Sequence, residues 1–144
     1  MQVDAILRVK GSNVERIAPD ASVRAAAHRM STQRLGCLVV TRDGSHVDGL
    51  ITERDVVRVV ANRGADASGC RVQDVMSTNV PTCAPTDQVS RLMRTMTERR
   101  YRHVPVVDNG ALVGVVSIGD VVKYRLSDME LETSVLRDVR AASR

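Results

Sequence analysis

The chain contains the same unit twice, and this internal repeat limits the folds that the sequence can adopt. The stretch APDASVRAAAHRM (residues 18–30) aligns with APTDQVSRLMRTM (residues 84–96), with Ala, Pro, Val and Met at matching places. Further along, CLVVTRDG aligns with HVPVVDNG, and GLITERDVV aligns with GVVSIGDVV. A repeat of this length indicates that each copy folds into the same small structural unit.

Each copy predicts the element order β-α-β-β-α. Each copy begins with a short extended piece, at residues 14–17 and 80–83, which is ended by Pro19 or Pro85. Two strand-like runs joined by a turn come later, at residues 37–41 and 47–51 in one copy and at 103–107 and 112–116 in the other. The sequence DNG in the second turn is a strong hairpin signal. A second helix begins at Thr52 or at Ser117. The first helix has apolar residues at i, i+3, i+4 and i+7, which is one helical face; they are Val23, Ala26, Ala27 and Met30 in one copy, and Val89, Leu92, Met93 and Met96 in the other.

We therefore predict an α/β (α+β) fold in which the two β-α-β-β-α repeats pack against each other, because one small sheet has too little core to stand alone. The boundaries that we expect are residues 12–63 for repeat 1, 64–77 for a linker and short helix (72–76), 78–126 for repeat 2 and 127–144 for the C-terminal helix. Small residues at 61–71 indicate a linker. A further short helix is expected at residues 3–10, ending at Gly11.

One long helix is expected over residues 121–144. Its apolar residues Val122, Leu126, Met129 and Leu136 recur at spacings of four, three and seven. Such a stripe requires a partner surface. It either packs on its own domain or forms a contact in a dimer.

The composition limits the compartment and the partners. Three cysteines, Cys37, Cys70 and Cys83, form no Cys-x-x-Cys pair, which favours reduced thiols in a cytoplasmic protein. No signal peptide is recognised, and no apolar run reaches the ~18 residues of a membrane span. The net charge of +4 comes mostly from arginine, which favours phosphate-bearing partners without distinguishing nucleotides from nucleic acids.

The repeated motif G-h-h-[ST]-x-x-D, where h is apolar, carries the chemistry. In both copies a hydroxyl residue, Thr52 or Ser117, comes where a strand becomes a helix, and Asp55 or Asp120 follows in the first turn. This arrangement is a common helix cap. A helix N-terminus with a free hydroxyl also binds anions, and a carboxylate accepts two hydrogen bonds from a ribose diol. Because both copies keep the glycine, the hydroxyl and the aspartate, we favour a pair of nucleotide sites over caps alone.

The chain resembles a tandem pair of cystathionine-β-synthase (CBS) domains, a Bateman module, of the kind found as stand-alone bacterial proteins. The matching stretches are APDASV and APTDQV, GLITERDVV, VQDVMSTNVPTCAPTD and RHVPVVDNGALVGVVSIGDVV. The resemblance covers residues 3–122. It implies pseudo-twofold packing of the repeats, two clefts that bind AMP, ADP, ATP, NAD or S-adenosylmethionine, and a homodimer that acts as a non-catalytic sensor for a regulated partner that the sequence does not name.

The resemblance also assigns residues to the two clefts. Asp55 and Asp120 would hold the ribose, and Thr52 and Ser117 would contact the phosphate, with Gly119 as a small residue beside it and Arg54 offsetting the charge of Glu53. The base slot of each cleft comes from the opposite repeat. It comprises Thr82, Arg102, His103, Val104 and Pro105 for the Asp55 cleft, and Arg16, Ile17, Gly36, Cys37 and Leu38 for the Asp120 cleft. Arg16 and Val39 stand where repeat 2 has Thr82 and Pro105, so the second slot departs from the family pattern.

Other function classes have weaker support in the sequence. Binding of nucleic acid, or of a regulatory protein, through the arginine-rich surface is the alternative, but the chain lacks aromatic stacking platforms and a clustered basic stripe. A catalytic barrel of ~250 residues does not fit in this chain, and no nucleophile–base pair is recognised, so we expect no enzyme. The histidines lack partners at metal-ligand spacing, so we expect no metal site. His28 is expected on a solvated helix face, and His103 either contacts phosphate or packs.

Overall fold

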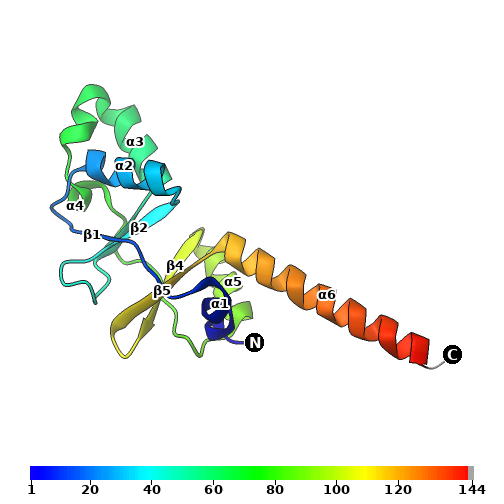
Figure 1. Ribbon diagram of the computed structural model, residues 1–144. Coiled ribbons are helices and arrows are strands. Elements are labelled where there is room, and N and C mark those ends of the chain that lie inside the picture. Colours follow the sequence, from blue (N-terminus) through cyan, green and yellow to red (C-terminus); the bar gives the residue numbers. More distant parts are fainter. Residues whose placement is uncertain (143–144) are drawn as a thin grey trace.

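The computed structural model describes residues 1–142, and it shows the β-α-β-β-α order in repeat 1 and the order α-β-β-α in repeat 2 (Figure 1). Ser143 and Arg144, the last two residues of the predicted C-terminal helix, lie outside the described residues. In repeat 1 the elements are β1 (Arg16–Ile17), α2 (Val23–Gln33), β2 (Cys37–Val40), β3 (Gly49–Thr52) and α3 (Glu53–Arg63). In repeat 2 they are α5 (Val89–Arg99), β4 (His103–Asp108), β5 (Ala111–Ser117) and α6 (Ile118–Ala142).

Each repeat builds a small sheet. In repeat 1, β1 runs parallel to β2, and β2 pairs antiparallel with β3. In repeat 2, β4 and β5 form an antiparallel hairpin whose turn places Asn109 and Gly110 at positive φ (50° and 79°), as the DNG sequence predicted. The predicted first strand of repeat 2, residues 80–83, is reduced to one parallel bridge between Cys83 and Val106.

Two short helices each pack against the repeat that does not directly follow them in the sequence. Helix α1 (Val3–Lys10) precedes repeat 1, yet its residues Val3, Ile6 and Leu7 belong to the core of repeat 2. Helix α4 (Val72–Val75) precedes repeat 2, yet Val72 belongs to the core of repeat 1. Each repeat is therefore covered by a helix that comes from the sequence before the other repeat.

The motif glycines allow this close packing. A Cβ atom added to Gly49 would lie 2.5 Å from the carbonyl oxygen of Ser77, and one added to Gly114 would lie 2.7 Å from a methyl carbon of Leu7. Leu7 belongs to the exchanged helix α1, and Ser77 follows the exchanged helix α4. Glycine is therefore required here for close approach, because a larger residue would displace the neighbour.

The repeats meet in a shared apolar cluster. Val14, Val39 and Leu50 of repeat 1 pack with Leu112 of repeat 2. The segment predicted as a linker, residues 61–71, is largely helical: it completes α3 and forms the 3₁₀ helix η1 (Gly64–Gly69). Ala67 and Cys70 from this segment are buried against repeat 1.

Helix α6 leaves the body of the molecule and extends beyond it (Figure 1). Near its start, Val121 is buried in the core of repeat 2 and Tyr124 packs against the same cluster. The predicted stripe Val122, Leu126, Met129 and Leu136 is exposed. The sequence left two alternatives for this stripe, packing on its own domain or contact in a dimer. The structure does not show the first, because the stripe does not pack on its own domain.

Candidate functional site

The two repeated motifs form the same helix cap. At the start of α6, the backbone N–H of Ser117 donates to Asp120 Oδ2 (2.8 Å), and the N–H of Asp120 donates to Ser117 Oγ (3.1 Å). At the start of α3, Thr52 and Asp55 make the equivalent bonds at 2.8 and 3.3 Å. The capping role predicted from each Ser/Thr-x-x-Asp sequence is therefore confirmed.

The two aspartates differ in their surroundings. Asp55 is 6% exposed, and its nearest cationic partner is the Arg58 guanidinium at 3.9 Å. The Asp120 side chain is 21% exposed, and its Oδ2 accepts a hydrogen bond from the Lys10 ammonium at 2.6 Å. Lys10 also donates to the carbonyl oxygen of Val115 at 2.7 Å. Partial burial raises the pKa of Asp120, but the bonds from Lys10 and Ser117 outweigh it and hold the pKa below its usual value.

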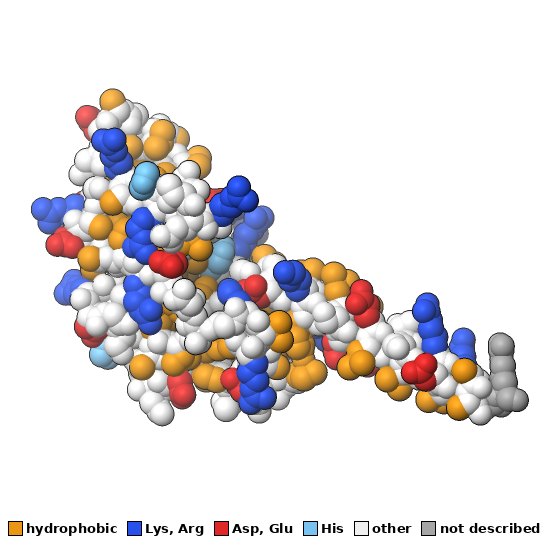
Figure 2. All heavy atoms as spheres, viewed as in Figure 1, with side chains coloured by type: hydrophobic (Ala, Val, Ile, Leu, Met, Phe, Trp, Pro, Cys, Tyr) orange, Lys and Arg blue, Asp and Glu red, His pale blue; other side chains and the backbone are white. Residues whose placement is uncertain are grey.

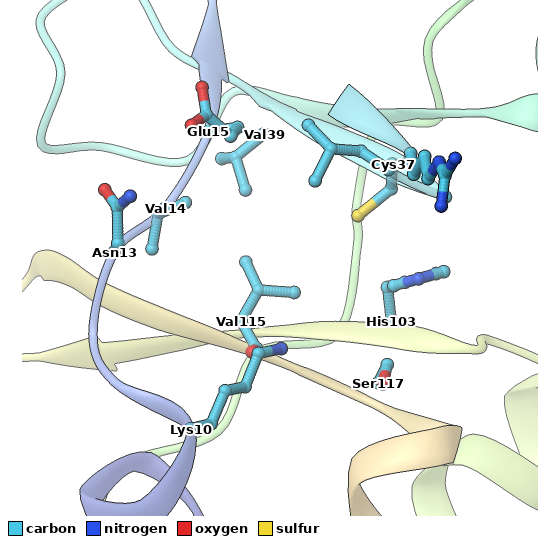
Figure 3. Close-up of a pocket in the computed structure, with 12 residues that line it drawn as sticks. Lys10, Asn13, Val14, Glu15, Cys37, Val39, His103, Val115 and Ser117 are labelled. Atoms are coloured by element: carbon cyan, nitrogen blue, oxygen red, sulfur yellow. The ribbon is translucent and has the colours of Figure 1, made fainter. Parts of the chain in front are cut away.

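A cleft of about 270 Å³ lies between the repeats beside Ser117 (Figure 3). Cys37 and Val39 project from β2 towards Val115 and His103 of repeat 2. The predicted residues that line the cleft are Gly36, Cys37, His103 and Ser117. The lining residues that sequence reasoning did not assign to a site are Lys10, Asn13, Val14, Glu15, Arg34, Leu35, Val39 and Val115.

His103 lies in a different place from the one that the resemblance implied. It was assigned to the Asp55 cleft, whereas the structure pairs it with Ser117 across the hairpin and places it in the cleft beside Ser117. Its imidazole lies against Gly36, where an added Cβ would be 3.0 Å away. Burial, followed by the nearby Lys10 ammonium, lowers the pKa of His103, although Asp120 and Glu53 oppose the shift. The lowered pKa favours the neutral form of the imidazole at pH 7.

The other assigned residues fall into three groups. Ile17 and Leu38, which were assigned to the Asp120 cleft, belong to the core of repeat 1 and do not line the cleft beside Ser117. Val104 and Pro105, which were assigned to the Asp55 cleft, are fully buried, and Val104 belongs to the core of repeat 2. Arg16 is held by hydrogen bonds to the carbonyl oxygens of Gly44 (2.8 Å) and Val14 (3.0 Å). The residues that lie on the exposed surface are Arg54, Thr82, Arg102 and Gly119.

The thiols and the remaining histidines have structural environments. All three cysteines are free, and burial raises the pKa of Cys37 to about 12 against a smaller opposing effect of Lys10. His28 is exposed, as expected. His46, which we expected to lack a carboxylate partner, has its Nδ1 at 2.5 Å from Asp43 Oδ2. Within residues 1–142, no group of three or more His, Cys, Asp and Glu side chains is placed to bind a metal ion.

Comparison with known proteins decides the family. The model of the CBS domain matches residues 8–62 and 72–127, which is most of the chain. The chain belongs to the CBS-domain family. This agrees with the family that the repeated motifs indicated, and with the fold of two packed repeats.

Relatives of known structure and sequence have the same architecture. The CBS-domain protein ATU1752 from Agrobacterium tumefaciens is 42% identical, with a TM-score of 0.83 over 87% of this chain and 99% of that one. A structure from Burkholderia ambifaria is 34% identical, with a TM-score of 0.79 over 89% of this chain and 96% of that one. The mitochondrial CBS domain-containing protein CBSX3 of Arabidopsis thaliana is 37% identical over 72% of this chain. The chain spans about half (52%) of that relative's length.

The structure also bears on the predicted absence of a membrane span. None of the helices within residues 1–142 is long and apolar enough to cross a bilayer.

Proposed function

We propose that this protein is a non-catalytic regulatory module that binds an adenosine-containing nucleotide in the cleft beside Ser117 and Asp120. The observation that carries the proposal is the placement of this cleft: it lies between the repeats, at the N-terminus of α6. A crystal structure of CBSX2 in complex with AMP has the same fold, with a TM-score of 0.72 and 23% identity. A protein of this fold therefore accommodates an adenine nucleotide.

The chemistry of the cleft suits the parts of such a ligand. Asp120 Oδ2 is occupied by Ser117 and Lys10, and Oδ1 remains for a ribose hydroxyl. The Ser117 hydroxyl and the N-terminus of α6 favour a phosphate. Val14, Val39 and Val115 supply apolar walls for a base.

The volume and the charge indicate a small ligand. A cleft of about 270 Å³ is near the lower end of the roughly 300–1,000 Å³ that is typical of ligand sites, so it fits a mononucleotide better than a dinucleotide. Lys10 lies at the cleft beside Asp120 and would attract the phosphate. Binding of the ligand across both repeats would fix their relative position and so alter the surface that a regulated partner recognises.

The Asp55 motif is proposed as a second, weaker site. Its carboxylate is almost fully buried, and Thr52 contributes two hydrogen bonds to the same oxygen, Oδ2, from its N–H (2.8 Å) and its hydroxyl (3.1 Å). A ribose at this site would have to reach a carboxylate that is already well satisfied. We therefore expect unequal occupancy of the two sites.

Calorimetric titration tests the proposal. AMP, ADP, ATP, NAD and S-adenosylmethionine are titrated into the wild type and into the Asp120→Asn and Asp55→Asn variants, which keep an acceptor for the helix cap. Loss of a charged hydrogen bond is worth about 1.5–3 kcal/mol, so Asp120→Asn is expected to weaken the tighter site by roughly 10- to 150-fold.

Four results would contradict the proposal. Absence of binding by every adenosyl ligand removes the sensor function. Unchanged affinity in both variants removes the assignment of the aspartates. Turnover of a nucleotide by the purified protein contradicts the non-catalytic role. Steeply salt-dependent binding of an oligonucleotide, without binding of an adenosyl ligand, favours the nucleic-acid alternative.

A further inference from the structure

The distal part of helix α6 has an apolar surface that the rest of the described chain, residues 1–142, does not cover. Leu126, Met129 and Leu136 are 54%, 59% and 64% exposed, respectively. Figure 2 shows hydrophobic side chains along the helix well beyond the body of the molecule. Isolated helices in water are marginal, and most helical stability in proteins comes from packing of an apolar face. A helix of 25 residues that leaves the body therefore requires a covering surface.

Five residues of α6, four of them apolar, follow a heptad pattern, whereas the exposed residues Leu131, Val135 and Val139 lie outside it. Val122, Leu126, Met129, Thr133 and Leu136 alternate at spacings of four and three, which is the 3.5-residue repeat of a coiled coil. Leu126 and Thr133 take the a positions, and Val122, Met129 and Leu136 take the d positions. We call these five residues the α6 seam.

The body of the molecule leaves the α6 seam free. Val121 and Tyr124 face the core of repeat 2, and at 3.6 residues per turn the seam lies roughly 130° around the helix from them. Val122 is 52% exposed although it directly follows buried Val121. The α6 seam therefore faces away from the core of repeat 2.

The charges beside the seam are complementary between two copies of this helix. Arg125 and Glu132 occupy g positions, and Glu130 and Arg137 occupy e positions. In a parallel, in-register pair, each g residue faces the e residue of the partner's next heptad. This pairs Arg125 with Glu130 and Glu132 with Arg137, and the twofold symmetry makes each pair twice. None of the four side chains takes part in an ion pair within residues 1–142.

We propose that α6 pairs with α6 of a second copy of this chain as a parallel, in-register, two-stranded coiled coil along the α6 seam. The occupant of the seam is an identical helix because the g and e charges match this helix's own sequence. Both bodies then lie at the same end of the coiled coil, on its outer sides. The nucleotide clefts are not part of the contact, so the inference is independent of the proposed function.

Sedimentation over a wide concentration range tests the contact. The wild type is expected to be a dimer, and Leu126→Ser is expected to weaken the dimer by at least about tenfold. Leu131→Ser is the matched control, because Leu131 is 65% exposed on the same helix but lies outside the seam. A monomeric wild type, or equal weakening by both substitutions, overturns the proposal. A folded helix in each variant is checked by circular dichroism.

The orientation is tested by cross-linking and by charge exchange. In a parallel pair, Val122→Cys places two thiols side by side and yields a disulfide-linked dimer on mild oxidation. Pairing in the opposite direction about the seam sets Val122 opposite Leu136 and separates the two thiols by roughly 21 Å along the axis. Ser127→Cys, which points away from the seam, is the control and is expected to remain unlinked. Glu130→Arg is expected to weaken the dimer, and Arg125→Glu together with Glu130→Arg is expected to restore it. The parallel arrangement is rejected if the protein is a stable dimer but Val122→Cys forms no disulfide. It is also rejected if the double variant Arg125→Glu, Glu130→Arg does not restore the dimer.

Discussion

Replacement of Lys10 by methionine removes the ammonium that links α1 to the start of α6 and keeps most of the side-chain length. The ammonium bonds to Asp120 Oδ2 at 2.6 Å and to the carbonyl oxygen of Val115 at 2.7 Å. The two charged side chains are 35% and 21% exposed, so the pair is neither fully solvated nor buried. Exposed pairs contribute about 0–1 kcal/mol, and breaking a buried pair costs about 3–5 kcal/mol. We expect a loss of about 1–2 kcal/mol in the free energy of unfolding.

The loss depends on pH in a defined direction. The pKa of Asp120 is lowered in the folded protein despite the opposing effect of burial. A carboxyl with a lowered folded pKa contributes stability above its unfolded pKa of about 3.9, and this contribution disappears as the pH falls through the folded value. The difference between the wild type and Lys10→Met is therefore complete at pH 7 and is expected to shrink below about pH 4.

Urea denaturation at neutral and acidic pH measures this difference, with Arg8→Met as the matched control. Arg8 lies in the same last turn of α1, so its interaction with the helix dipole is similar, but its pair with Asp4 is far more exposed (78% and 38%). That substitution is expected to cost at most about 0.5 kcal/mol. The reasoning is refuted if Lys10→Met costs no more than Arg8→Met, or if its cost at pH 2 equals that at pH 7.

Three further predictions concern the motif glycine, the buried histidine and the cleft thiol. Gly49→Ala is expected to lower the free energy of unfolding by about 1–3 kcal/mol because its Cβ meets a backbone oxygen, whereas Gly69→Ala, in open space, stays within about 0.5 kcal/mol in the same urea titration. Since burial lowers the pKa of His103, the wild type is expected to lose thermal stability as the pH falls below about 6.5, and His103→Gln flattens this dependence while exposed His28→Gln does not. A pKa of about 12 for Cys37 predicts that iodoacetamide alkylates this thiol roughly 30-fold more slowly in the folded than in the unfolded protein. Peptide mass spectrometry measures the two rates, and equal rates would contradict the prediction.

Local patterns made most of the fold predictable. The apolar residues at i, i+3, i+4 and i+7 placed α2 and α5, and the two Ser/Thr-x-x-Asp caps placed the starts of α3 and α6. These signals depend on residues within one or two turns of each other, so they are readable without tertiary structure. The roles of the cap residues towards a nucleotide stay predictions.

Long-range contacts were not predictable from the same signals. Lys10 and Asp120 are 110 residues apart in sequence, and nothing local to either residue indicates their contact. Which of the two motifs His103 lies beside depends on how the repeats pack, and the resemblance assigned it to the Asp55 cleft, whereas it lines the cleft beside Ser117. For α6, the apolar stripe indicated a covering surface but carried no information about whether that surface belongs to the same chain.

The exchange of α1 and α4 between the repeats has a consequence for a chain that would carry a single unit. A segment made of one leading helix and one repeat holds a helix that belongs on another unit and lacks the one that closes its own core. Two such segments satisfy each other only by trading helices, as in a domain-swapped dimer. Joining both units in one polypeptide keeps the exchange partner at a high effective concentration. Duplication in this chain thus lets both cores close within one polypeptide.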